Sequence, residues 1–559
     1  MPNIIIEDVP FNRNVMNEID KQYIESFPVV YIIRNNGKNV AYIGETVSVK
    51  RRMKDHLKNS EKKRLDVVHI VGEEKFNKSA TLGLETKLIN YFVGDQKYRL
   101  LNKAKLSKTK SHNYFQKKMY EEEYFVEIWK KLLDKGIVDN KQSVIENRDV
   151  FKLSPFKELS EEQLELKDTI LEFCQKAEHK NMAEHGQQIL FISGEAGTGK
   201  SVLLSATFNE LQRLANDKEI DTNPLYGTEN YLLVNHSEML KTYTSIAKNI
   251  PNLQAKNFMK PTSFINKMDK EGKRANIVFI DEAHLLLSKK DAYNSFHYEN
   301  QLEEVIKRAD TIICMYDEKQ ILKMKSYWDS NLLKKIKKNY RTIEQKLTEQ
   351  FRMKASISTL KWIDSFVNGK IAELPNDNNY EIKIFESLEK MHEAIKEKNN
   401  KYGISRVVST FDYAHKKDGK DYFVGDDKFK LPWNRNYKTK TWAEMEQTID
   451  EVGSIYTIQG FDLNYVGVNI GPSVKLNKNT LELELDTSKY CDTEAYKKNE
   501  YIPENEVEQI KQKIILNSLN VLMKRGVYGL YLYADDKELN NYLLELQQNR
   551  ANKNSENTD

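Results

Sequence analysis

Short apolar runs recur between residues 151 and 545, and helical segments separate them. Their length and lack of polar positions are typical of strands buried on both faces of a parallel sheet. One group lies at 189–194, 230–235, 276–281 and 311–316, and a second at 406–410, 465–471 and 529–534. The pattern predicts an α/β fold with two lobes, 151–340 and 341–545. We interpret the acidic, irregular stretch around 481–512 as an insertion in the second lobe.

A different pattern occupies residues 20–105, where strands and helices are mixed. The runs 29–34 and 40–44 flank an Asn-Asn-Gly-Lys turn, which is the signature of a β-hairpin. The sequence also predicts a basic helix at 49–57, a strand at 66–71 and an amphipathic helix at 79–92. Residues 106–150 are polar and rich in Lys and Glu, which predicts a helical linker, and the polar tail 546–559 is predicted to be disordered.

The composition is that of a globular protein, with 39% hydrophobic and 30% charged residues. A chain of 559 residues is too long for one core, so about three to four domains are expected. No apolar run reaches the roughly twenty residues that a membrane helix needs. The three cysteines show no paired spacing. These features predict a cytoplasmic protein with no membrane partner.

The net charge of +4 does not by itself indicate a nucleic-acid partner. Its distribution says more, because bases concentrate between residues 50 and 64 and again between 103 and 118. Such patches attract phosphate backbones, although a solvated surface is the ordinary alternative for any one of them.

Residues 194–201 read Gly-Glu-Ala-Gly-Thr-Gly-Lys-Ser and lie between a predicted strand and a predicted helix. This is the spacing G-x-x-x-x-G-K-S of a triphosphate-binding loop. Glycines let backbone N–H groups surround the phosphates, and the helix N-terminus adds a favourable dipole. We expect Lys200 to pair with the β- and γ-phosphates of ATP and Ser201 to ligate Mg²⁺. The other residues expected to contact the nucleotide are Gly194, Gly197, Thr198 and Gly199.

The apolar run 276–281 ends in two carboxylates, Asp281 and Glu282. We expect Asp281 to hold the magnesium ion through a water, and Glu282 to orient or deprotonate the attacking water. A lone Asp-Glu pair after a strand is usually part of a solvated loop. Because this pair follows a phosphate-binding loop in the same predicted lobe, the two motifs together predict ATP hydrolysis.

Later segments resemble motifs of superfamily 1 helicases. They are LSEEQLEL at 159–166, YDEKQ at 316–320, LTEQFR at 347–352, YTIQGFD at 456–462 and VLMKRG at 521–526. The stretch most resembles the Schlafen-group-3-like DNA/RNA helicase family, which implies a P-loop core of two RecA-like lobes. By this resemblance Gln163 reads the adenine edge, Gln320 is the γ-phosphate sensor, and two arginines reach the γ-phosphate. These arginines are Arg352 and Arg525. Gln459 and Gly460 belong, by the same resemblance, to the late nucleotide-binding motif.

Several of these assignments have ordinary alternatives. Arg352 or Arg525 taken alone is a surface salt bridge more often than an arginine finger. Asn235 and His236 resemble a segment that touches the nucleic-acid strand, but a helix cap explains them equally well. His284 departs from the glutamine usual in superfamily 1, which weakens inference about how hydrolysis is coupled to the strand.

Residues 20–105 carry an ordered set of six polar side chains on the predicted hairpin and the elements after it. Tyr31 ends Val-Val-Tyr on the first strand, and Tyr42 opens Tyr-Ile-Gly on the second. Arg52, His56, Glu85 and Asn102 follow in order. The set resembles the GIY-YIG nuclease superfamily, which implies a small α+β domain that hydrolyses phosphodiesters with one Mg²⁺ or Mn²⁺ ion.

The same resemblance implies a role for each residue. Glu85 holds the metal, Tyr42 is the general base or relays a proton to it, and Arg52 contacts the scissile phosphate. Tyr31 and His56 support proton transfer, and Asn102 helps to fix the site. A phenol with a pKa near 10 is a poor base unless neighbouring positive charge lowers that pKa. The metal and an arginine are expected to do so.

The nuclease set also has departures and alternatives. The first triad is Val-Val-Tyr rather than Gly-Ile-Tyr, and Glu45 places a carboxylate near the expected phosphate path. A hairpin tyrosine is ordinarily a packing residue, and a helical arginine, histidine or glutamate is ordinarily a surface charge. The interpretation therefore depends on the ordered set rather than on any single residue.

The sequence thus predicts a nuclease–helicase fusion, in which a metal-dependent endonuclease is joined to an ATP-driven translocase on DNA, with RNA as a possible substrate. One alternative is a regulatory ATPase that gates the nuclease without translocation. Another is a non-catalytic module that only binds nucleic acid. The combination suggests antiviral defence against phage or DNA repair. The sequence does not define the oligomeric state.

Overall fold

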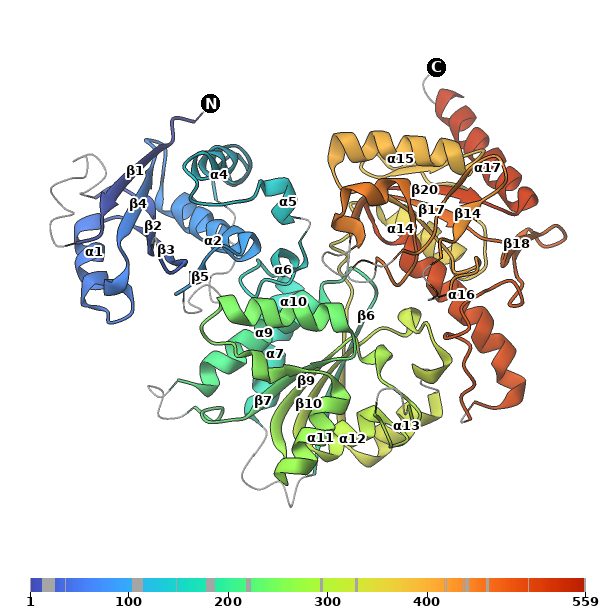
Figure 1. Cartoon of the computed structure of the whole chain (residues 1–559), viewed down its shortest axis with the longest axis horizontal. Coiled ribbons are helices and arrows are strands. Elements are labelled where there is room, and N and C mark those ends of the chain that lie inside the picture. The colour runs from blue at the N-terminus through green and yellow to red at the C-terminus, as the bar shows by residue number, and fades with distance from the viewer. Residues whose placement is uncertain are drawn as a thin grey trace. The chain divides into compact units, whose positions relative to one another are not determined.

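The computed structural model describes residues 2–12, 26–35, 37–102, 114–146, 148–176, 186–217, 223–291, 295–326, 330–416, 418, 420–435, 437, 442–458, 462–500 and 502–556 (Figure 1). The chain divides into two compact units. The first comprises residues 1–188, 201–281 and 309–313, and the second comprises 189–200, 282–308 and 314–559.

The first unit contains a five-stranded sheet with the order β1-β4-β2-β3-β5. Its strands are β1 Ile5–Pro10, β2 Val29–Asn35, β3 Val40–Thr46, β4 Val67–Gly72 and β5 Arg99–Leu100. The predicted hairpin is confirmed, because β2 and β3 pair antiparallel with Tyr31 opposite Gly44. The edge strand β1, which the sequence pattern did not indicate, pairs antiparallel with β4.

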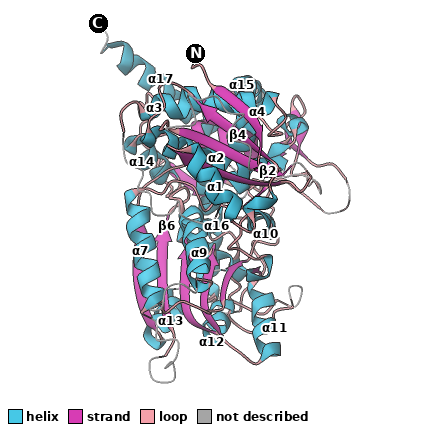
Figure 2. Cartoon of the chain, turned by 90° about the vertical axis from the view of Figure 1, so that its left-hand side faces the viewer, coloured by secondary structure: helices cyan, strands magenta, loops and turns pink. Residues whose placement is uncertain are grey.

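This domain also contains the helices α1 Val49–Lys58 and α2 Lys78–Asp95 (Figure 2). Both agree with the predicted helices to within a few residues. Val49 and Met53 of α1 are buried in one core with Val29, Ile33 and Val68 of the sheet. The buried face of α1 also carries His56. Burial of this face therefore fixes the orientation of a predicted site residue.

Residues 117–134 are helical, as predicted, but they do not form a linker. The continuous helical segment ends in α4 Phe125–Asp134, and Trp129 packs edge-on against Phe92 of α2. Phe125 and Trp129 are buried. Short helices follow at α5 Gln142–Glu146 and α6 Asp149–Lys152. The prediction of a linker failed because buried aromatic residues are spaced widely among the charged ones, so the mean composition is polar.

A six-stranded sheet has the strand order β11-β6-β10-β9-β7-β8. Its strands are β6 Gln188–Gly194, β7 Asn230–Val234, β8 Phe258–Met259, β9 Ala275–Asp281, β10 Ala309–Tyr316 and β11 Arg341–Leu347. Within the first unit β7 pairs in parallel with both β8 and β9, as its apolar sequence predicts. The helices of this region are α7 Glu161–Gln175, α9 Lys200–Ala215, α10 Ser237–Asn249, α11 Pro261–Glu271, α12 Gln301–Lys307 and α13 Ser330–Asn339.

The second unit contains a five-stranded sheet with the order β12-β20-β17-β13-β16, and all of its pairs are parallel. The strands are β12 Glu381–Ile384, β13 Arg406–Ser409, β16 Val452–Gly453, β17 Leu463–Ile470 and β20 Gly526–Ala534. The accompanying helices are α14 Ile357–Phe366, α15 Leu388–Tyr402, α16 Val507–Met523 and α17 Lys537–Glu556. The three apolar runs predicted for the second lobe are its central strands.

One prediction for the second lobe needs correction, and another gains detail. The tail after residue 546 is helical through Glu556, because α17 continues there and Arg550 donates hydrogen bonds to the carbonyls of Pro375 and Ile382. The stretch 481–512 includes β19 Glu482–Leu485, paired with β18 Val474–Asn477, and the start of α16. The Asn499 amide donates to the carbonyl of Met324. This stretch therefore contains regular secondary structure and packs against its own unit, and its interpretation as an insertion stays a prediction.

The remaining hairpin of the second unit is β14 Phe423–Gly425 with β15 Lys430–Pro432. Among the described residues, no helix is both long and apolar enough to span a membrane. The architecture is thus α/β, with a small mixed sheet followed by parallel-sheet lobes, as the sequence predicts.

Candidate functional site

The phosphate-binding loop connects β6 to α9. Gly197 and Gly199 have φ angles of +89° and +76°, which favour glycine because residues with a Cβ rarely adopt them. The buried ammonium of Lys200 donates to the carbonyls of Gly194 at 2.6 Å and Glu195 at 2.9 Å. It also lies 3.7 Å from the carboxylate of Asp317. The Thr198 hydroxyl donates to the Glu195 carbonyl at 2.9 Å. The predicted loop residues thus form one cradle.

Asp281, the last residue of β9, is fully buried and held on both oxygens. The Ser201 hydroxyl donates to its Oδ1 at 3.2 Å, and the Tyr243 hydroxyl of α10 donates to its Oδ2 at 2.6 Å. A hydroxyl and a carboxylate at this spacing provide the hard oxygen ligands that Mg²⁺ prefers, with waters completing its shell. Sequence reasoning missed Tyr243, because a tyrosine in a helix looks like an ordinary core residue.

Glu282 follows Asp281 in a left-handed backbone conformation, with φ 49° and ψ 48°. Its carboxylate lies 3.1 Å from Nε2 of the buried His284. Burial raises the pKa of Glu282, and the charges of Lys200, Arg525 and Arg352 oppose that rise. The electrostatic surroundings of Glu282 therefore include the arginines of both late motifs. Strained backbone of this kind is common at functional positions.

The segment 350–352 is bonded directly to the phosphate-binding loop. The Gln350 amide donates to the Ala196 carbonyl at 2.7 Å, and the Phe351 N–H donates to the Gly197 carbonyl at 2.9 Å. Gln350 Oε1 also accepts from the Arg352 backbone N–H at 3.0 Å. A Cβ at Gly197 would lie 2.0 Å from that same oxygen. The Arg352 side chain pairs with Asp462 at 2.5 Å.

Arg525 and Gln320 are both buried. The Gln320 amide donates to Asp317 at 2.7 Å. Beside Arg525, the buried ammonium of Lys524 bonds to Glu195 of the loop and to Asp364, each at 2.7 Å. Burial opposes ionisation of Glu195, but hydrogen bonds from Lys319 and Lys524 lower its pKa to about 2. Glu195 therefore stays charged and holds the loop to these lysines.

The other predicted nucleotide-site residues have mixed outcomes. Gln163 is buried in a capping box, where its side-chain oxygen accepts from the Ser160 N–H at 3.1 Å. Gln459 and Gly460 lie outside the described residues. His236 caps α10 by accepting from the Met239 N–H at 3.3 Å, so the alternative role as a helix cap is present in the structure.

The two nuclease tyrosines face each other from β2 and β3, with ring centroids 6.3 Å apart. A Cβ at Gly44 would lie 2.2 Å from the Tyr31 hydroxyl, so only glycine leaves room for that ring. The Tyr-Ile-Gly spacing thus has a steric reason within this chain. Asn102 closes the same strand by accepting from the Ile43 N–H at 3.1 Å and donating to the Ile43 carbonyl at 2.7 Å.

Arg52 and His56 of α1 both contact the Tyr31 hydroxyl. Arg52 Nε donates to it at 3.1 Å, and His56 Nε2 lies 2.8 Å away. Lys62 Nζ lies 3.2 Å from His56 Nδ1. Because an ammonium only donates, Nδ1 accepts, and the neutral imidazole carries its proton on Nε2. The Tyr31 oxygen therefore accepts two hydrogen bonds, and its own proton is directed elsewhere.

The pKa shifts follow from this arrangement. Burial, reinforced by Lys62 and Arg52, lowers the pKa of His56 to about 3, so the ring is neutral near pH 7. Burial raises the pKa of Tyr42, and the charge and the hydrogen bond of Arg52 oppose that rise. Lys62 Nζ also lies 3.4 Å from the centroid of the Tyr42 ring. Sequence reasoning counted Lys62 only as part of a basic run.

Glu85 of α2 lies beside Glu45, whose backbone N–H bonds to its carboxylate. Burial and the negative charge of Glu45 raise the pKa of Glu85 to about 7, while Arg52 and Lys78 oppose the rise. Lys78 pairs with both oxygens of Glu45. A half-buried carboxylate with a second acid nearby fits a divalent cation that keeps most of its waters. Among the described residues no group of three or more His, Cys, Asp or Glu gathers.

Two family models match separate parts of the chain. Residues 187–536 match the family model of the Schlafen group 3 DNA/RNA helicase domain, and residues 27–99 match the GIY-YIG catalytic domain. The chain is 41% identical over 413 residues to the uncharacterized protein YPL245W of Saccharomyces cerevisiae, covering 69% of this chain and 90% of that protein.

Among solved structures, the Pif1 helicase of Candida albicans matches 69% of this chain and 99% of its own, at 12% identity and a TM-score of 0.25. The helicase model alone covers more than half of the chain. The protein therefore belongs to the Schlafen group 3 DNA/RNA helicase domain family and joins that domain to a GIY-YIG nuclease domain.

Proposed function

We propose that the chain is an ATP-driven nucleic-acid motor coupled to a metal-dependent endonuclease. One observation supports ATP hydrolysis most directly. The hydroxyl of Ser201, the residue directly after the buried Lys200, lies 3.2 Å from Asp281 Oδ1. A lysine, a hydroxyl and a carboxylate in this sequence order are the groups that bind a triphosphate with Mg²⁺. The family membership implies nucleic acid as the partner.

Lys200 would exchange its two carbonyl acceptors for β- and γ-phosphate oxygens when ATP binds. Ser201 and Asp281 would hold the magnesium ion, which neutralises developing negative charge on the phosphates. Glu282, directly after Asp281, would orient the attacking water and accept its proton. Burial raises the pKa of Glu282, which makes its carboxylate a stronger proton acceptor once it is ionised.

Arg352 and Arg525 would stabilise charge on the transferring phosphoryl group. The positive charges of both arginines already act to lower the pKa of Glu282. Because Gln350 bonds to the phosphate-binding loop and to the Arg352 backbone, a change in the loop is transmitted to that arginine. Hydrolysis would thereby be coupled to movement of the segment that carries Arg352.

In the nuclease domain Glu85 would hold a Mg²⁺ or Mn²⁺ ion, which supplies Lewis-acid stabilisation of the scissile phosphate. Arg52 would bind that phosphate. Tyr42 would accept a proton from water, directly or through a second water, once it is ionised to the phenolate. The charges of Arg52 and Lys62 and a bound cation would favour that form against the effect of burial. Neutral His56 and Arg52 both donate to Tyr31 and would keep its oxygen in place.

Cleavage of a panel of labelled single-stranded, duplex and forked DNA and RNA, with and without ATP, tests this proposal. Cutting should require Mg²⁺ or Mn²⁺ and should be abolished in Tyr42→Phe, Arg52→Ala and Glu85→Ala. Equal nicking by wild type and Glu85→Ala would assign the activity to a contaminant or to another site. Tight binding without cutting by the wild type would favour the non-catalytic binding module instead.

Strand displacement separates the motor from a regulatory switch. The translocase displaces a fluorescent oligonucleotide from a forked duplex in an ATP-dependent reaction, whereas a switch hydrolyses ATP without displacement. For the cellular role we propose nucleic-acid defence or DNA repair. Loss of the gene should then change phage plating efficiency or sensitivity to DNA damage, and unchanged values in both assays would contradict the assignment.

A further inference from the structure

Helix α10, Ser237–Asn249, has one buried face and one polar face. Met239, Tyr243, Ile246 and Ala247 are buried. The opposite positions are Ser237, Leu240, Lys241, Thr244, Ser245 and Lys248. Their spacings of one, three and four residues place all six on one side of the helix. This polar face is not used by the ATP-binding residues, although Tyr243 on the buried face contacts Asp281.

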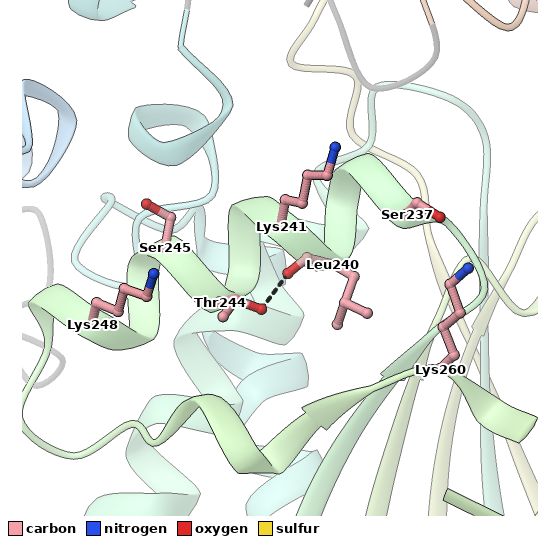
Figure 3. Close-up of a pocket in the computed structure, with 7 residues that line it drawn as sticks. All are labelled: Ser237, Leu240, Lys241, Thr244, Ser245, Lys248 and Lys260. Carbon is pink, nitrogen blue, oxygen red and sulfur yellow. Dashed lines mark hydrogen bonds between the residues drawn. The ribbon is translucent and has the colours of Figure 1, made fainter. Parts of the chain in front are cut away.

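The polar face of α10 lines a hollow of about 450 Å³ together with Lys260 (Figure 3). Lys241 and Lys248 extend from the helix, and Lys260 comes from the connection between β8 and α11. The lining residues thus carry three ammonium groups and three hydroxyls, and none of the seven is acidic. Lys241 and Lys248 are exposed and Lys260 is half-buried. The hollow, called the α10 hollow below, is a cationic surface with hydrogen-bonding side chains.

The arrangement of the charges matches a linear polyanion. Lys241 and Lys248 are seven residues apart on one helix, a separation of about 10 Å along the axis. Lys260 directly follows β8, whose parallel neighbour β7 leads into α10, so the third charge lies at the carboxyl edge of these strands. A single small anion would use one of these charges, whereas a phosphate backbone can use all three.

At Ser245 the hollow contacts the nuclease domain, which belongs to the same compact unit. Gln96, the residue directly after α2, donates a hydrogen bond to the Ser245 hydroxyl at 3.0 Å. Glu85 lies on that same α2. The α10 hollow is therefore placed between strands of the ATPase lobe and the helix that carries the predicted nuclease metal ligand.

We propose that the α10 hollow binds the phosphate backbone of a nucleic-acid strand that is held by the motor and presented to the nuclease domain. This inference rests on the proposed function, because it assumes that the chain engages nucleic acid. Lys241, Lys248 and Lys260 contact phosphates along the strand. The Ser245 hydroxyl, which accepts from Gln96, can donate its proton to a phosphate oxygen, whereas the Thr244 hydroxyl already donates to the Leu240 carbonyl. Such contacts are independent of base sequence and sensitive to salt.

Fluorescence anisotropy of the full-length chain with labelled dT20 and rU20, at several salt concentrations, tests the proposal. For single strands the slope of log K against log salt falls by about 0.7 for each phosphate that the protein no longer neutralises. The triple variant Lys241→Ala, Lys248→Ala, Lys260→Ala should therefore show a slope smaller by about 2 and at least tenfold weaker binding at low salt. The matched control removes two exposed lysines of α15, Lys396 and Lys401, and should bind as wild type does.

Three outcomes would overturn the proposal. The triple variant could match the control in affinity and slope, polyglutamate could displace dT20 as efficiently as unlabelled dT20 does, or inorganic phosphate at low millimolar concentration could displace it fully. Absence of any wild-type binding would instead contradict the proposed function itself. Basal ATPase without nucleic acid should be unchanged in the triple variant, which shows that α10 still supports Asp281 through Tyr243.

Discussion

The acidity of Glu85 makes nuclease activity depend on pH in a specific way. Its pKa is raised to about 7 by burial and by Glu45. A carboxyl with a raised pKa is protonated below that value, and only its deprotonated form binds a cation. Between pH 8 and pH 6 the deprotonated fraction falls about tenfold for a pKa near 7, but by only a few per cent for an ordinary glutamate. The MgCl₂ concentration that half-saturates cleavage should therefore rise about tenfold.

Plasmid nicking measured against MgCl₂ at pH 6, 7 and 8, at fixed ionic strength, provides the assay. Glu45→Gln is the informative partner variant, because it removes the largest charge that raises the pKa of Glu85 and releases Lys78 from its ion pair. Its half-saturating MgCl₂ should vary less with pH than that of wild type. An equal half-saturating concentration at pH 6 and pH 8 in the wild-type protein would refute the reasoning.

Three further substitutions test separate interactions. Gly44→Ala places a Cβ against the Tyr31 hydroxyl and should abolish cleavage, whereas Gly37→Ala, whose nearest neighbour is 3.7 Å away, should cut normally. Gln350→Ala removes the bonds to the loop and to Arg352. It should lower kcat for ATP about tenfold at unchanged nucleotide affinity, since two bonds of about 0.7 kcal/mol each correspond to that factor. A change in affinity alone would contradict this. Tyr243→Phe frees one oxygen of Asp281 and should raise the Mg²⁺ requirement of ATP hydrolysis, and an unaltered Mg²⁺ titration would exclude that role.

The sequence predicted the elements whose physical signal is local. The runs at β6 and β9 are apolar throughout, because strands inside a parallel sheet are buried on both faces, and their positions follow directly. In contrast β11 reads Arg-Thr-Ile-Glu-Gln-Lys-Leu and is largely exposed, so no hydrophobic pattern marks it as a strand. The position of β11 in the sheet depends on β6, which lies far away in the chain.

The same distinction holds for the candidate sites. Spacing in the sequence was enough to indicate Lys200, Ser201 and Asp281, because the chain brings them to one loop and one strand end. Lys62 and Tyr243 could not be found this way, since their roles come from contacts with His56 and Asp281 across the fold. The direction of the Tyr42 pKa also required the structure. Burial raises it, while the sequence suggested only the opposing charge of Arg52.

The most direct test of the central claim is ATP hydrolysis by the purified full-length chain, measured with and without single- and double-stranded DNA and RNA. A nucleic-acid motor should hydrolyse ATP severalfold faster when its strand is present, and both Lys200→Ala and Glu282→Gln should abolish basal and stimulated hydrolysis. A wild-type rate that no DNA or RNA changes would contradict the motor, and hydrolysis that survives in both variants would contradict the assigned ATP site.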